Sequence, residues 1–144
     1  MVVTIDTNVL FSALYSSAGA SHQILQLVLE EDIKVAVSAN TYFEYYDVLM
    51  REKSRKELAL SQVEVEDLLD LLALLAQKHE IYYFLRPNLP DEKDNMFVEC
   101  AFASNSQYLV TSNVKDFRRS ELKGFKFEVI TPGSFIKKWR GKNE

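Results

Sequence analysis

Short apolar runs, several of them rich in β-branched residues, alternate along this chain with segments of helical periodicity. A continuous apolar run is typical of a strand that is buried on both faces of a parallel sheet. Strands separated by helices predict such a sheet with helices on both faces. The expected fold class is therefore α/β, a three-layer α/β/α arrangement around a central, mostly parallel sheet of four to five strands. The candidate strands are residues 2–5, 33–37, 79–85, 108–111 and 125–130.

Local capping signals mark where helices begin. Ser61 and Glu64 have the spacing of a capping box, and they precede leucines at helical spacing. Pro132 stands where a last helix would begin, since proline is favoured at the first helical position. We expect this last helix to end near Trp139.

The chain length and composition limit the organisation of the protein. At 144 residues with 47% hydrophobic content, the chain fits one compact domain with one core. We expect a single domain over residues 1–140 and a disordered tail over residues 141–144. No stretch approaches the roughly 18 apolar residues of a membrane span, and no secretory signal is apparent. The one cysteine, Cys100, offers neither an internal disulfide nor a cysteine-based zinc site, so we expect a cytoplasmic protein.

The net charge of −4 and the sequence pI of about 5.3 disfavour nucleic-acid binding through bulk positive charge. Basic residues nevertheless cluster at 51–56, 115–126 and 137–142, where they are either solvated surface or phosphate contacts. A bound divalent cation also changes the sign of a local acidic site. An acidic composition therefore does not exclude a nuclease.

Acidic residues fall near the carboxyl ends of the predicted strands, the edge where sites form in open α/β sheets. Asp6 follows the first strand, and Glu44 lies in the segment after the second. Asp94 opens the helix that leads into the fourth strand, and Asp116 follows that strand. Carboxylates gathered at one edge repel each other unless a cation joins them, and Mg²⁺ or Mn²⁺ prefers oxygen ligands. The reaction suited to such a site is phosphodiester hydrolysis.

Each of these acids also has a structural interpretation when it is considered alone. Asp6 could cap the helix that follows it, and Glu44 could complete a capping box with Thr41. Asp94 could be a first-turn acid that interacts with the helix dipole. Asp116 could start a short helix or turn. Only the four acids together favour a metal site.

Four segments resemble motifs of the PIN domain family, within the bacterial group of toxins from toxin–antitoxin systems. They read VTIDTNVL at 3–10, SANTYFEYYDVL at 38–49, PDEKDNMFVE at 90–99 and YLVTSNVKDF at 108–117. The resemblance covers nearly the whole chain. It implies a PIN-like fold and a ribonuclease that depends on Mg²⁺ or Mn²⁺ and cuts RNA. It also implies an antitoxin protein as a partner, and a homodimer.

Position by position, the resemblance assigns roles to the acidic residues. Asp6, Glu44 and Asp94 match the three most characteristic acids and would act as catalytic metal ligands. Asp116 would supply a fourth carboxylate or point away. The supporting polar residues would be Asn8, Thr111, Ser112 and Asn113.

The chain departs from the family pattern at Asn113, where an acid often follows Thr-Gly. Asparagine is neutral, so a second metal would be held weakly. This departure motivates an alternative, a catalytically weakened PIN-like module that binds RNA or protein. A phosphatase with an aspartate nucleophile at Asp6 is disfavoured, because Asn8 stands where that chemistry needs a second acid.

Two apolar features of the helices have open interpretations. The aromatic residues of one helix, at positions 42, 43, 45 and 46, are partly core, and some could form a base-stacking platform. The leucine-rich segment 68–75 has leucines on more than one face. It is either deeply buried or meets another subunit.

Overall fold

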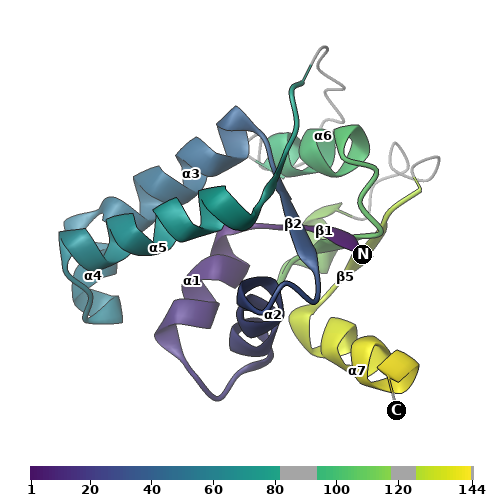
Figure 1. Ribbon diagram of the computed structural model, residues 1–144, viewed down its shortest axis with the longest axis horizontal. Coiled ribbons are helices and arrows are strands. Elements are labelled where there is room, and N and C mark those ends of the chain that lie inside the picture. Colours follow the sequence, from purple (N-terminus) through teal and green to yellow (C-terminus); the bar gives the residue numbers. More distant parts are fainter. Residues whose placement is uncertain (82–93, 118–125, 144) are drawn as a thin grey trace.

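The computed structural model describes residues 1–81, 94–117 and 126–143 (Figure 1). Its strands form one five-stranded sheet in the order β3-β2-β1-β4-β5, and every neighbouring pair is parallel. The first strand is therefore the central one. The strands are β1 (Val2–Ile5), β2 (Lys34–Val37), β3 (Gln77–Lys78), β4 (Tyr108–Val110) and β5 (Glu128–Ile130).

Helices connect the strands and cover the sheet. They are α1 (Thr7–Tyr15), α2 (Ala20–Leu29), α3 (Ala39–Met50), α4 (Glu52–Leu58), α5 (Gln62–Leu75), α6 (Asn95–Ala103), the 3₁₀ helix η2 (Val114–Phe117) and α7 (Pro132–Asn143). In Figure 1, α6 lies on one side of the sheet and α2 and α7 lie on the other. The predicted three-layer α/β/α class is confirmed. Within the described ranges, no helix combines the length and the apolar character that a membrane span requires.

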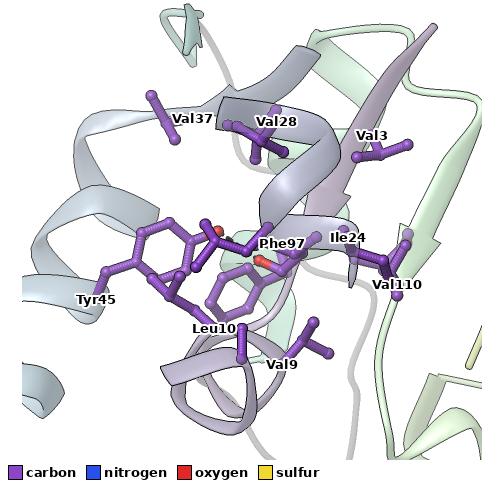
Figure 2. Packing of buried hydrophobic residues seen from close by; sticks show 14 of the residues in the cluster. Val3, Val9, Leu10, Ile24, Val28, Val37, Tyr45, Phe97 and Val110 are labelled. Carbon is purple, nitrogen blue, oxygen red and sulfur yellow. Dashed lines mark hydrogen bonds between the residues drawn. The ribbon is translucent and has the colours of Figure 1, made fainter. Parts of the chain in front are cut away.

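The central strand is buried on both faces, as its continuous apolar run predicts. Val3 and Ile5 belong to the hydrophobic core, in which residues from α1, α2, α3 and α6 also pack (Figure 2). The intervening residue, Thr4, is fully buried, and its hydroxyl lies 2.9 Å from the Ser106 hydroxyl. Hydrogen bonding offsets the cost of burying this polar group. Cys100 of α6 is buried as well.

Two predicted elements have different ends in the structure. The third strand was predicted at 79–85, but β3 lies just before it, and 82–85 are outside the described residues. Both residues of β3 are exposed and polar, so hydrophobic periodicity does not reveal them. The last helix does begin at Pro132 but continues to Asn143, beyond the predicted end near Trp139.

Two capping boxes set the starts of α3 and α5. Ser61 and Glu64 form the predicted box, with hydrogen bonds of 3.1 Å in both directions. At α3, the N-cap is Ser38, and its hydroxyl accepts from the backbone N–H of Thr41. The Thr41 hydroxyl in turn accepts from the backbone N–H of Ser38. The structural interpretation of Glu44, as the partner of Thr41 in a capping box, is therefore wrong. Glu44 has no capping role.

Candidate functional site

Asp6 lies at the carboxyl end of the central strand, where its backbone N–H and both of its carboxylate oxygens form hydrogen bonds. Its backbone N–H donates to the Val110 carbonyl at 3.1 Å, which extends the pairing of β1 with β4 by one residue. One carboxylate oxygen, Oδ1, accepts from the backbone N–H of Val9 at 3.0 Å, so Asp6 does cap α1. The other oxygen, Oδ2, accepts a hydrogen bond from the Thr111 hydroxyl. Asp6 thus caps a helix and also joins β1 to the end of β4.

Burial makes Asp6 electrostatically unusual. Its side chain is only 5% exposed, and desolvation raises the pKa of its carboxyl above the ordinary value. The hydrogen bonds from Thr111 and from the start of α1 lower the pKa, but burial is the larger effect. A nearby cation would favour the ionised form and counter the burial. Asp6 is therefore a carboxylate that a cation would stabilise.

Thr111 connects Asp6 to the turn after β4. It is fully buried, and its backbone N–H donates to the Ile130 carbonyl at 2.9 Å. Its hydroxyl also accepts from the backbone N–H of Asn113 at 3.0 Å. Ser112 and Asn113 themselves are exposed. The structure therefore brings Thr111 directly to Asp6 and places Asn113 one hydrogen bond further away.

Glu44 is half-buried on α3, the helix that follows β2. Because β2 is next to β1 and parallel to it, α3 begins at the same edge of the sheet as Asp6. Within the described part of the chain, the Glu44 side chain forms no hydrogen bond or ion pair. Its carboxylate oxygens are thus available to a ligand.

The other two acids lie at the start of α6 and in η2. Asp94 is half-buried at the N-cap position of α6, where its side chain makes no capping hydrogen bond. Asp116 is half-buried in η2, and its backbone N–H donates to the Asn113 carbonyl at 3.0 Å. A short helix is therefore present, but it begins at Val114 and not at Asp116. Asn8, predicted to support the site, is exposed on α1.

The predicted residues share one edge of the sheet through topology. The Asp6 side chain bonds directly to Thr111, and Asn113 is hydrogen-bonded to both Thr111 and Asp116. Among residues 1–81, 94–117 and 126–143, no three acidic, histidine or cysteine side chains stand close enough to hold a metal ion. The proposed donor set consists of oxygen atoms alone, contributed by Asp6, Glu44, Asp94 and Asp116. This chemistry fits Mg²⁺ or Mn²⁺, which take oxygen ligands and retain several waters.

Two cavities that share several lining residues lie at the ends of β2 and β3. One of about 580 Å³ is lined by polar residues that include Asn40, Lys78 and His79. The other, of about 350 Å³, has mainly apolar walls, and Phe43 lines it with a side chain that is 68% exposed. Hydrophobic periodicity does not single out Lys78 and His79 as cavity-lining residues, because they lie at and just after a polar edge strand.

The hydroxyl of Tyr45 makes a contact that periodicity does not predict. It donates to the carbonyl of Ile5, the residue before Asp6. Tyr45 is fully buried, so the expectation that some aromatic residues of this helix belong to the core is confirmed.

Comparisons with known proteins agree with this architecture. The family model described as the PIN domain matches residues 2–115. A chain in the crystal structure of VapBC2 from Rickettsia felis, bound to a DNA fragment from their promoter, is similar, with a TM-score of 0.59 and 19% sequence identity. The alignment covers 91% of this chain and 98% of that chain, and at this identity it shows the fold alone. No curated protein matches. The sequence match and the fold together show that the chain belongs to the PIN domain family, a family of nucleases.

Proposed function

We propose that this protein is a metal-dependent endoribonuclease that hydrolyses RNA phosphodiester bonds with Mg²⁺ or Mn²⁺. The observation that carries the proposal is the buried, hydrogen-bonded Asp6 carboxylate at the carboxyl end of the central strand. A carboxylate that is costly to ionise in isolation is well suited to a cation. It stands at the edge where open α/β sheets bind their ligands.

In this proposal, Asp6 and Asp94 are the principal metal ligands. Glu44 completes the set or orients a water, and Asp116 is the fourth carboxylate. Together these residues would hold a cation, which would lower the pKa of water and stabilise negative charge on the phosphate and the leaving oxygen. The hydrogen bonds from Val9 and Thr111 fix the Asp6 carboxylate before any ligand arrives. Such preorganisation reduces the reorganisation needed during the reaction.

The proposal extends to a toxin–antitoxin role, with an antitoxin protein as partner and a homodimer as the assembled state. The VapBC2 structure is a complex by its description, and it shares this fold. The leucine-rich helix α5 also supports an assembly, because it has two apolar faces. Leu69 and Leu72 are buried in the core, whereas Leu71 is 40% exposed and Leu74 is 76% exposed. Light scattering that finds only monomers at high concentration would remove the dimer from the proposal.

The test of the catalytic proposal is cleavage of single-stranded RNA, structured RNA and DNA with Mn²⁺ or Mg²⁺. We expect RNA cutting that stops when the metal is chelated. The Asp94→Asn variant, assayed beside the wild type, is expected to lose cleavage. Equal cutting by the variant would indicate a contaminating nuclease or a different site. DNA cutting without RNA cutting would reject the substrate class.

A second candidate function is an RNA- or protein-binding module with a weakened site. The observation in its favour is Asn113, a neutral, exposed residue where the family often has an acid. Folded wild-type protein that binds RNA with no cleavage under several divalent metals would select this function over the first.

Phe43 provides a separate prediction about RNA binding. Its exposed ring lines the apolar cavity at the carboxyl end of β2, so it is placed to stack on a base of single-stranded RNA. We expect Phe43→Ala to weaken RNA binding by about 1–3 kcal/mol, the usual contribution of one stacked base, and to leave Mn²⁺ affinity unchanged. The matched control is Tyr15→Ala. Tyr15 is similarly exposed, at 66%, but lies at the far end of α1. Fluorescence anisotropy with a short labelled RNA measures the RNA affinity of both variants. Equal weakening in the two variants would exclude specific stacking.

A further inference from the structure

The hydrogen-bonded pairing between β1 and β2 stops one bond short of Asp6. The two strands are parallel, and the N–H of Lys34 donates to the Met1 carbonyl at 2.9 Å. In a parallel ladder, such donors and acceptors recur every second residue. The carbonyl of Ile5 is therefore in register for the N–H of Ser38. That N–H instead donates to the Thr41 hydroxyl at 2.9 Å, within the capping box of α3.

Tyr45 takes the place of the missing strand donor. Its hydroxyl donates to the Ile5 carbonyl, so this carbonyl is satisfied by a side chain of α3. The Tyr45 ring is fully buried and packs against Phe97 of α6, with the ring centroids 6.0 Å apart (Figure 2). One side chain thus ties α3 both to the end of β1 and to α6.

These contacts fall beside three of the proposed metal ligands. Ile5 immediately precedes Asp6, and Tyr45 immediately follows Glu44. Phe97 lies on the first turn of the helix that Asp94 opens. A shift of α3 against β1 would therefore change the separation of the Glu44 and Asp6 carboxylates directly.

We infer that Tyr45 is a positioning residue that fixes the Glu44 carboxylate relative to the Asp6 carboxylate, an inference that rests on the proposed metal site. The physical reason is that a buried carbonyl without a donor is costly. If the hydroxyl is removed, the end of β1 and the start of α3 must separate or admit water to satisfy it. Misplacement by about 1 Å can reduce catalysis by roughly 100-fold even when every reacting group remains.

The test is Tyr45→Phe, which removes the hydroxyl and keeps the buried ring. We expect Mn²⁺ affinity, measured by titration calorimetry, to fall about tenfold, as for other groups that orient metal ligands. In RNA cleavage, kcat should fall while KM changes little. The matched control is Tyr42→Phe on the same helix. The Tyr42 hydroxyl also donates to a main-chain carbonyl, that of Leu69 at 3.2 Å, but Leu69 belongs to α5. We expect this control to keep its Mn²⁺ affinity.

Amide hydrogen exchange provides a measurement that does not need the metal. The Asp6 N–H should exchange faster in Tyr45→Phe and at the wild-type rate in Tyr42→Phe. Unchanged Mn²⁺ affinity in Tyr45→Phe, or equal weakening in both variants, would overturn the inference. A wild type that neither binds Mn²⁺ nor cuts RNA would instead reject the proposed function. In that case, unchanged exchange at Asp6 would also reject the structural role of Tyr45.

Discussion

Asp6→Asn is expected to reduce RNA cleavage by more than about 100-fold and to leave the fold intact. Loss of a group that only orients a metal ligand already costs roughly 10- to 100-fold, and Asp6 is proposed as a ligand itself. Asparagine keeps the shape of the side chain, and its oxygen can still accept from the Val9 N–H that caps α1. The variant should therefore lose the cation and not the helix.

The same variant is expected to be more stable than the wild type in the absence of metal at neutral pH. Burial raises the pKa of Asp6 in the folded state. A carboxyl with a raised folded pKa contributes stability at low pH, below its unfolded pKa, and this contribution is lost as the pH rises through the folded pKa. At neutral pH, the wild type therefore bears the cost of a buried charge, which asparagine removes.

Thermal denaturation with a chelator, across the acidic to neutral range, measures this effect. The melting temperature of the wild type should approach that of Asp6→Asn as the pH falls. Added Mn²⁺ should raise only the wild-type value, because a ligand that binds the folded state stabilises it. The control is Asp47→Asn, whose carboxylate forms an exposed ion pair of 2.7 Å with Arg51 on α3. Its cleavage should be unchanged. If Asp6→Asn proves less stable than the wild type in chelator at neutral pH, the electrostatic account of the site is wrong.

Phe117→Ala is expected to destabilise the protein by about 3–5 kcal/mol, the usual cost of truncating a buried phenylalanine. Phe117 is 1% exposed and ends η2, the 3₁₀ helix that carries Asp116. A 3₁₀ helix of four residues has little internal stability, so the buried ring anchors it. Removing the ring should release Asp116 as well as destabilise the core, and RNA cleavage should fall with it.

Phe135→Ala separates these two effects. Phe135 is also 1% exposed, but it lies on α7 and packs edge-on against Tyr108, with ring centroids 5.6 Å apart. Urea denaturation should show a similar loss of stability in both variants. At a low temperature where both are folded, only Phe117→Ala should lose cleavage. Full activity in Phe117→Ala under those conditions would remove Asp116 from the proposed site.

Much of the fold could be predicted from the sequence because the signals are local. The apolar run at Val2–Ile5 predicts a buried strand, and burial on both faces is what the structure shows. The Ser61 and Glu64 pair predicts the start of α5, because both hydrogen bonds of the box lie within one turn. The carboxyl-end position of Asp6 also follows from the order of strands and helices. Each of these features depends on residues that are close together in the chain, so the local sequence is enough to predict it.

Other features were decided only by the tertiary structure, because they depend on partners that are distant in the chain. The strand at Gln77–Lys78 has no apolar pattern and exists through its pairing with β2. The bond between Thr111 and Asp6 joins residues that are brought together by the neighbouring positions of β1 and β4. The Tyr45 hydroxyl reaches Ile5 because the capping box of α3 removes a strand donor. The sequence thus determined which polar residues arrive at the carboxyl edge of the sheet, whereas packing and long-range hydrogen bonds determined which of them touch.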